Sequence, residues 1–327
     1  MERKLFVHVG PMKTGTTALQ NFLRDHDGSL VLYPKTGQFG SGAHHNLVYN
    51  FLGDFSNSST VREDCESLFK RIVAESRRSN APVVISSELL VLQGSIGKFI
   101  ETLLGYLDGN FEVEILYAVR EYFARAASIY SQTLKDIRYL ERSSPDEFII
   151  ARAPMIAYEP SLSMLAKTGF KVHVIKYDPA SRFASRFLEH LGFPADRIPA
   201  IPVRNRSLSI KGMIVRLAIN RAVSTIEQRQ EFVPVVQQLR PQFGRSRFIF
   251  GHEAATTAEQ RFRYDRVLVH RDFGAAVLQR NLATSKNEFW IGENDFEEII
   301  STDAEVGAAH DRFRECLWEF VRSSSVE

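Results

Sequence analysis

Residues 4–25 read KLFVHVGPMKTGTTALQNFLRD, and the interpretation of the whole chain starts from them. Residues 4–9 are a short apolar run, rich in β-branched side chains, that stops at a Gly-Pro pair. From Thr16 onward, apolar side chains recur with helical spacing, at Ala18, Leu19, Phe22 and Leu23. The segment therefore predicts a strand, a glycine-containing loop and a helix, in that order.

The same alternation continues through the first 200 residues. Further strands are expected at 83–85, 113–119 and 172–177, and further helices at 62–79, 96–107, 121–137 and 181–191. Strands that alternate with helices form a parallel sheet with helices on both faces, which is the α/β class. Beyond Pro202 only helical periodicity is visible, over 208–229, 255–284 and 304–322. We therefore expect a single domain over 1–327, with an α/β core over 1–200 and a mainly helical section over 201–327.

Composition narrows the possible classes of function. With 327 residues, of which 44% are hydrophobic and 24% charged, the chain can bury a core without disulfides or metals. The 41 basic and 39 acidic side chains leave a net charge of +2, which argues against a dedicated binder of duplex nucleic acid. Cys65 and Cys316 are too few for a disulfide framework, and no apolar segment has the length of a signal peptide or a membrane span. We expect a cytoplasmic protein in which any anion site is local.

The loop between the first strand and the first helix has the features of a phosphate site. Glycines let the backbone wrap closely around a phosphate, and the N–H groups at a helix N-terminus point toward such an anion. Lys13 adds a positive charge, and Thr16 and Thr17 add hydroxyl donors. The loop is not the Walker pattern, in which lysine directly follows the second glycine, because here Lys13 precedes Gly15 by two residues.

A second basic residue, Arg120, is expected in the same crevice. It directly follows the predicted strand 113–119, and the carboxyl ends of parallel strands face the crevice where such sheets bind ligands. Its guanidinium suits a bidentate contact with a phosphate. Ser128 follows eight residues later and shares one face of the predicted helix with Arg125 and Gln132.

The phosphate loop resembles that of the sulfotransferases that use 3′-phosphoadenosine 5′-phosphosulfate (PAPS). In that family a loop of lysine, Ser/Thr, glycine, Thr/Ser and Thr grips the 5′-phosphosulfate of the donor. The matching residues here are Lys13, Thr14, Gly15, Thr16 and Thr17. The resemblance implies a P-loop-like sulfotransferase fold of the bacterial or carbohydrate-type branch. It also implies PAPS as donor, 3′-phosphoadenosine 5′-phosphate (PAP) as product and no metal.

Two further elements extend the resemblance. Family members have a strand that ends in arginine, with a serine eight positions on, and both contact the 3′-phosphate; Arg120 and Ser128 match this pattern. Family members also place a loop with basic and amide side chains over the nucleotide. Arg204 is the candidate for it, in the run Arg204-Asn205-Arg206-Ser207, which is equally compatible with a solvated helix start.

Sulfuryl transfer also needs a group that takes the proton of the acceptor hydroxyl as it attacks in line. In the family this group is a histidine or a glutamate. His44 and His45 end a Gly/Ser-rich loop over 36–43, comparable to where glycosaminoglycan-type members carry glutamate. Glu88 follows the strand 83–85, where phenol- and steroid-type members carry histidine. His45 is favoured because imidazole titrates near neutrality, with Glu88 orienting or replacing it, and Lys13 is assigned to the leaving phosphate.

The sequence thus predicts a PAPS-dependent sulfotransferase that acts on a hydroxyl of a carbohydrate or small metabolite. Nucleic acid, a membrane span and a metal are not expected, and the near-neutral charge favours a small or neutral acceptor. Two alternatives stay open. A P-loop-type kinase is disfavoured by the displaced lysine and by the absence of an evident aspartate for Mg²⁺, and a non-catalytic nucleotide-binding module would keep the loop without the chemistry.

Overall fold

The computed structural model describes residues 3–26, 28, 31–40, 42–54, 60–92, 94–107, 111–136, 140–177, 183–194, 210–233, 250–274, 312, 315 and 319. The chain forms two compact units, each assembled from separate segments. The first contains Met1–Glu121, Tyr158–Asn205 and Asp265–Gln279, and the second contains Tyr122–Ala157, Arg206–Tyr264 and Arg280–Glu327.

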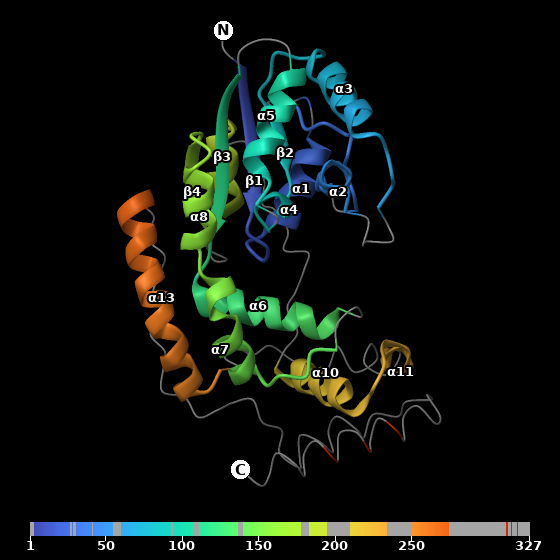
Figure 1. Ribbon diagram of the computed structural model, residues 1–327, viewed down its shortest axis with the longest axis vertical. Helices are drawn as coiled ribbons and strands as arrows, with labels where there is room; N and C mark the ends of the chain where they lie inside the picture. Colours follow the sequence, from blue (N-terminus) through green and yellow to red (C-terminus); the bar gives the residue numbers. More distant parts are fainter. Residues whose placement is uncertain are drawn as a thin grey trace. The chain divides into compact units, whose positions relative to one another are not determined.

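Four parallel strands form the sheet in the described part of the first unit (Figure 1). They are β1 (Arg3–Gly10), β2 (Val83–Ser86), β3 (Phe111–Val119) and β4 (Lys171–Lys176), in the order β2-β1-β3-β4. The register pairs Leu5 of β1 with Val83 of β2 and with Val113 of β3. The first predicted strand therefore lies inside the sheet, where its run of apolar side chains is buried.

Helices cover both faces of this sheet. On one face, α1 (Thr16–Asp25) and α9 (Phe183–His190) form a single buried cluster with strand residues such as Phe6 and Leu116. Side chains that point to the other face of the sheet, such as those of Val7 and Ile115, are fully buried as well. The prediction of an α/β protein with an all-parallel sheet flanked by helices is confirmed.

The other helices of the first unit surround the sheet. They are α2 (His45–Leu52), α3 (Cys65–Ser76), α4 (Leu89–Leu92), α5 (Ile96–Tyr106) and α8 (Glu159–Ala166). α4 contacts β1, and α8 contacts β4. α3 and α5 pack through aromatic rings, with the Phe69 and Phe99 centroids 5.8 Å apart.

The second unit is helical in its described part. It contains α6 (Tyr122–Lys135), α7 (Pro145–Ile156), α10 (Ile210–Ala222) and α11 (Ile226–Gln230), and α6 packs against α7 and α10. α13 (His252–Phe273) crosses the division between the units, which falls at Tyr264 and Asp265. None of the described helices combines the length and the apolar character that crossing a membrane requires.

The helix boundaries depart from the predicted ones where local capping decides them. The predicted helix 208–229 is interrupted, because Thr225 and Gln228 form a capping box that starts α11 afresh. Likewise, Ser144 and Glu147 form the capping box of α7, a helix that the sequence analysis did not predict. The predicted helix 304–322 lies almost entirely outside the described residues. The prediction of a single domain stays a prediction.

Candidate functional site

The predicted site residues of the first unit follow three neighbouring strands at one edge of the sheet. The loop over 10–15 follows β1, Glu88 comes two residues after β2, and Arg120 directly follows β3. Because all strands are parallel and β1 lies between β2 and β3, these three segments meet at the same edge. The sheet thus brings together residues that are up to 107 positions apart, since Arg120 Nη1 donates to the carbonyl of Lys13 at 3.0 Å.

The backbone of the loop is held in an uncommon conformation. Lys13 has φ of 69°, in the left-handed region that non-glycine residues rarely occupy, and Gly15 at the start of α1 has φ of 82°. A non-glycine residue in this region costs about 1–3 kcal/mol and persists only where the surroundings enforce it. Among the described residues no side chain caps the N-terminus of α1, and the first N–H groups of a helix lack the usual intrahelical partner. The N–H of Ala18 donates instead to the Gly15 carbonyl at 3.2 Å. N–H groups at a helix start and a neighbouring lysine are groups that can bind an anion.

The threonines of the loop differ in what they can offer a ligand. Thr14 is fully buried and its hydroxyl donates to the carbonyl of Pro11 at 2.7 Å, so this proton is already used within the loop. Thr16 is buried and its side chain hydrogen-bonds to Glu88. Thr17 is half-buried, and its carbonyl accepts a hydrogen bond from the Asn21 amide at 2.8 Å.

Arg120 is held tightly at its backbone and has hydrogen-bonding capacity left on its side chain. The Tyr158 hydroxyl donates to the Arg120 carbonyl at 2.6 Å and accepts from the Arg120 N–H at 2.9 Å. The Arg120 guanidinium lies 5.1 Å from the centroid of the Tyr177 ring. Arg120 Nε is buried without a hydrogen-bond partner in the described part of the chain, and burial lowers the pKa of the guanidinium. A phosphate oxygen would satisfy that buried donor.

His45 and Glu88 lie against each other, as a base and its orienting group would. His45 Nε2 is 3.4 Å from Glu88 Oε2, and His45 Nδ1 is 2.8 Å from the Ser87 hydroxyl. Burial lowers the pKa of the His45 imidazole, and the Glu88 charge opposes this only in part. Burial alone would raise the pKa of the Glu88 carboxyl, but the charge of His45 and the hydrogen bond from Thr16 outweigh it and leave that pKa below its ordinary value. The pair therefore consists of an ionised carboxylate and a neutral imidazole at neutral pH.

His44 occupies a different environment from that of its neighbour. His44 Nε2 is 2.8 Å from the carbonyl of Pro34, and Nδ1 accepts from the N–H of Ser86 at 3.1 Å. Burial lowers the pKa of its imidazole to about 4, so His44 stays neutral near pH 7. Because both ring nitrogens are bonded to backbone, His44 has none left for an acceptor hydroxyl. His45 and Glu88 are the remaining candidates for the base.

Two predicted cofactor residues lie outside the described part of the first unit. Ser128 is half-buried on α6, which belongs to the second unit, and its contact with a 3′-phosphate stays a prediction. Arg204 lies outside the described residues, together with the rest of the expected third cofactor loop.

The structure adds buried polar residues that the sequence analysis did not single out. Gln20 of α1 donates through Nε2 to the Ser86 hydroxyl at 3.0 Å and to Glu88 Oε2 at 3.3 Å. The Ser86 hydroxyl also lies 2.8 Å from His8 Nδ1, and burial lowers the pKa of His8 to about 4. A signal was present in the sequence, because His8 and Gln20 are polar residues within apolar runs of a predicted strand and helix.

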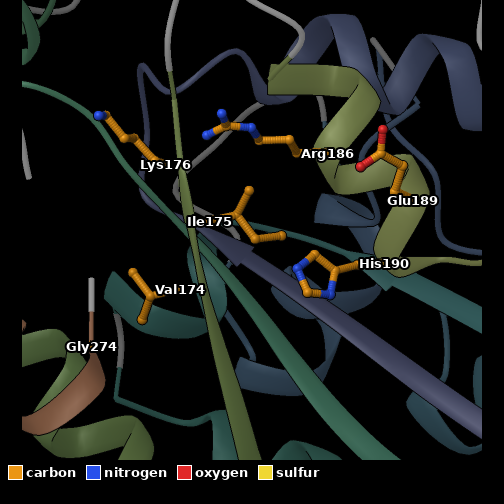
Figure 2. Close-up of a pocket in the computed structure, with 7 residues that line it drawn as sticks. All are labelled: Val174, Ile175, Lys176, Arg186, Glu189, His190 and Gly274. Carbon is orange, nitrogen blue, oxygen red and sulfur yellow. The ribbon is translucent and has the colours of Figure 1, made fainter. Parts of the chain in front are cut away.

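A pocket of about 520 Å³ lies along β4, and none of its lining residues was selected from the sequence. It is lined by Val174, Ile175, Lys176, Arg186, Glu189, His190 and Gly274. Figure 2 shows the Arg186 side chain extending from α9 over β4. Among the described residues no three His, Cys, Asp or Glu side chains are grouped as metal ligands would be. The prediction that no metal is used stays a prediction.

The chain was compared with models of protein families, with curated proteins and with solved structures, and none of them matches it.

Proposed function

We propose that this chain is a PAPS-dependent sulfotransferase with the sulfotransferase variant of the P-loop-like fold. It would transfer the sulfuryl group of PAPS to a hydroxyl of a carbohydrate or small metabolite. One observation carries the proposal: the Lys13 loop, Arg120 and the His45–Glu88 pair lie at the carboxyl ends of three adjacent parallel strands. Anion-binding groups and a base at the same edge of a sheet are what this reaction needs.

The two basic residues suit the two charged ends of the donor. PAPS supplies an activated sulfuryl group on a 5′-phosphate that leaves as the acceptor attacks. The loop amides at the start of α1 and the Lys13 ammonium would bind this 5′ end and stabilise the charge that develops on it. Arg120 would bind the 3′-phosphate, because Tyr158 fixes its backbone and its buried Nε has no hydrogen-bond partner among the described residues.

The His45–Glu88 pair would take the acceptor proton. Both groups are in their basic forms at neutral pH, since the pKa of each lies below its ordinary value. A proton on His45 creates an imidazolium 3.4 Å from the Glu88 carboxylate, and this charge pair stabilises the protonated state. We therefore expect kcat to stay high below pH 6.5, the ordinary imidazole pKa, and to fall only as the solution becomes more acidic.

A binding experiment separates the proposed donor from the nucleotide of a kinase. We expect PAP to raise Tm in the absence of metal, because a ligand at about 100 times its Kd stabilises the folded state by about 2.7 kcal/mol. ATP with Mg²⁺ should give a smaller shift, because the loop lacks the Walker lysine position. Stabilisation by ATP with Mg²⁺ alone would overturn the proposal.

A transfer experiment separates an enzyme from a nucleotide-binding module. The full chain is incubated with ³⁵S-labelled PAPS and a panel of sugars, phenols and small hydroxylated metabolites. Label should appear on at least one neutral sugar or metabolite, and His45→Ala with Glu88→Gln should abolish that transfer without weakening PAP binding. Tight PAP binding with no turnover on the whole panel would support a non-catalytic module instead.

A further inference from the structure

Glu88 is held from one side by a single helix, α1. Thr16 and Gln20 are four positions apart on α1, so their side chains share a face, and both hydrogen-bond to Glu88. Gln20 is 1% exposed and Glu88 is 7% exposed, so solvent cannot readily replace these bonds. A buried carboxylate is stable in its ionised form only when such donors are present.

The Gln20 amide is fixed by two acceptors at once. Its Nε2 carries two hydrogens, one for the Ser86 hydroxyl at 3.0 Å and one for Glu88 Oε2 at 3.3 Å. Glu88 Oε2 is also the oxygen that lies 3.4 Å from His45 Nε2. The amide thus defines where that oxygen sits relative to the imidazole.

We infer that Gln20 is a positioning residue of the proposed site, whose amide holds the Glu88 carboxylate against His45. A role of Gln20 in catalysis rests on the proposed function, but the hydrogen bond between Gln20 and Glu88 can be tested without measuring activity. Gln20 also joins the base to the phosphate loop, because α1 begins at Thr16, directly after Gly15. The loop therefore continues into the same helix whose side chains hydrogen-bond to Glu88.

Other titratable groups face Glu88 and must be separated from the effect of Gln20. His45 reaches it from α2, His8 from β1, and the Tyr33 hydroxyl from the segment before α2. Burial lowers the pKa of His8 to about 4, so His8 is neutral at neutral pH but titrates in the same acidic range as Glu88, and its ring signals are followed in the same titration. Removing the Gln20 amide takes one donor from the carboxylate and leaves all three of these groups in place.

The test compares Gln20→Met with Gln38→Met in the full chain. Methionine keeps the side-chain volume and removes the amide. Gln38 is the control because its amide donates to the carbonyl of Pro34 at 2.8 Å and, among the described residues, not to Glu88. In Gln20→Met, a ¹³C NMR titration should give Glu88 a higher pKa than in the wild type, because a donor to the charged form is lost. Gln38→Met should leave the Glu88 titration unchanged.

Kinetics give the second readout. Gln20→Met should lower kcat by about 10- to 100-fold, as a misplaced catalytic group does, and change KM for PAPS by less than about 2-fold. The acidic limb of the kcat profile should move to higher pH with the raised pKa of Glu88. A merely structural role would lower Tm without moving that limb.

The outcomes distinguish this inference from the proposed function. A raised pKa of Glu88 in Gln20→Met supports the positioning role even if no acceptor is ever turned over. An unchanged Glu88 titration together with an unchanged pH profile overturns it, whether or not the wild type is a sulfotransferase. If Gln20→Met does not fold, the hydrogen bond between Gln20 and Glu88 can be tested by NMR in the wild-type protein. The side-chain amide protons of Gln20 should shift with the titration of Glu88, and their failure to do so contradicts the inference.

Discussion

At the scale of single residues, Lys13 has a backbone conformation that lowers the stability of the fold and a side chain that is proposed to serve the reaction. Its φ of 69° costs free energy that glycine would not pay, while the ammonium that it carries contributes little to the buried core. The positive φ of Lys13 fits the proposed role of its ammonium, because glycine would adopt this backbone conformation at a lower free energy but would lack the charge.

We expect Lys13→Ala and Lys13→Gly both to abolish sulfuryl transfer while leaving the fold intact, because both remove the ammonium. The glycine variant should exceed the alanine variant in free energy of unfolding by about 1 kcal/mol, since only glycine is relaxed at this φ. Urea unfolding of the two variants measures the difference, and the transfer assay measures the loss. Activity within a few-fold of wild type in either variant would contradict the leaving-group role.

Arg120 provides a second prediction at this scale. Arg120→Ala should weaken PAP binding by about 2–5 kcal/mol through loss of a charge-assisted contact with the 3′-phosphate. Isothermal titration calorimetry measures the change in Kd. Arg263→Ala, at an exposed position of α13, is the control and should bind PAP as the wild type does. An unchanged affinity in Arg120→Ala would remove this residue from the site.

At the scale of elements, arginines recur at the carboxyl ends of helices in the second unit. Arg229 donates to the Asp136 carbonyl at 2.6 Å and to the Leu134 carbonyl, both at the end of α6. Arg142 donates to the Asn220 and Val223 carbonyls at the end of α10, at 3.0 and 2.7 Å. The last carbonyls of a helix have no intrahelical partner and carry partial negative charge, so a guanidinium satisfies and stabilises them.

Arg229 is the most deeply buried of these residues, with no exposed surface. Arg229→Met should lower the free energy of unfolding by about 2–4 kcal/mol, because buried carbonyls lose their donors. The matched control, Arg263→Met on the exposed face of α13, should change it by less than about 0.5 kcal/mol. Thermal and urea unfolding of both variants test the prediction, and equal effects would contradict the capping role.

At the scale of the whole molecule, buried neutral histidines make stability depend on pH. Burial lowers the pKa of His8 and of His44 to about 4, from the ordinary value of 6.5 that the unfolded chain has. Between these values the unfolded state binds more protons than the folded one, so stability falls as pH drops from about 6.5 to about 4. Carboxyls with lowered pKa values, such as that of Glu114, add to the loss only below about 4.5.

We expect urea unfolding to show full stability above pH 7 and a progressive loss toward pH 5. For His44 the loss amounts to about 3 kcal/mol once the pH reaches 4. His44→Gln, which keeps a side-chain donor for the Pro34 carbonyl, should be less stable at pH 7 but show a shallower dependence between pH 5 and 7. An equally steep dependence in this variant would show that other groups cause it.

Much of the sheet could be predicted because its signals are local. β1, β2, β3 and β4 are apolar runs next to glycine, proline or polar segments, and each was expected within a few residues of its observed bounds. The sequence did not predict α2, α4, α7 or α8. α2 begins at His45, inside what was interpreted as a loop, and the start of α7 depends on a capping box rather than on hydrophobic periodicity.

The candidate site also has residues that local sequence signals identify and contacts that only the folded chain shows. Lys13, Gly15 and Arg120 could be selected from the sequence because a loop or a strand end defines them locally. Two hydrogen bonds could not be predicted in this way. One joins Gln20 to Glu88, 68 positions away, and the other joins His45 to Ser87, 42 positions away. They depend on how α1 and α2 pack on the end of β2, which side-chain periodicity does not reveal.

The sequence by itself determined the α/β class, the phosphate-type loop after the first strand and the arginine after the third, because each follows from local spacing and chain direction. Only the tertiary structure decided that His45 rather than His44 faces Glu88, and that Gln20, Ser86 and Ser87 surround this pair. The physical reason is burial. A side chain's partner and protonation state depend on neighbours that folding brings in from distant segments.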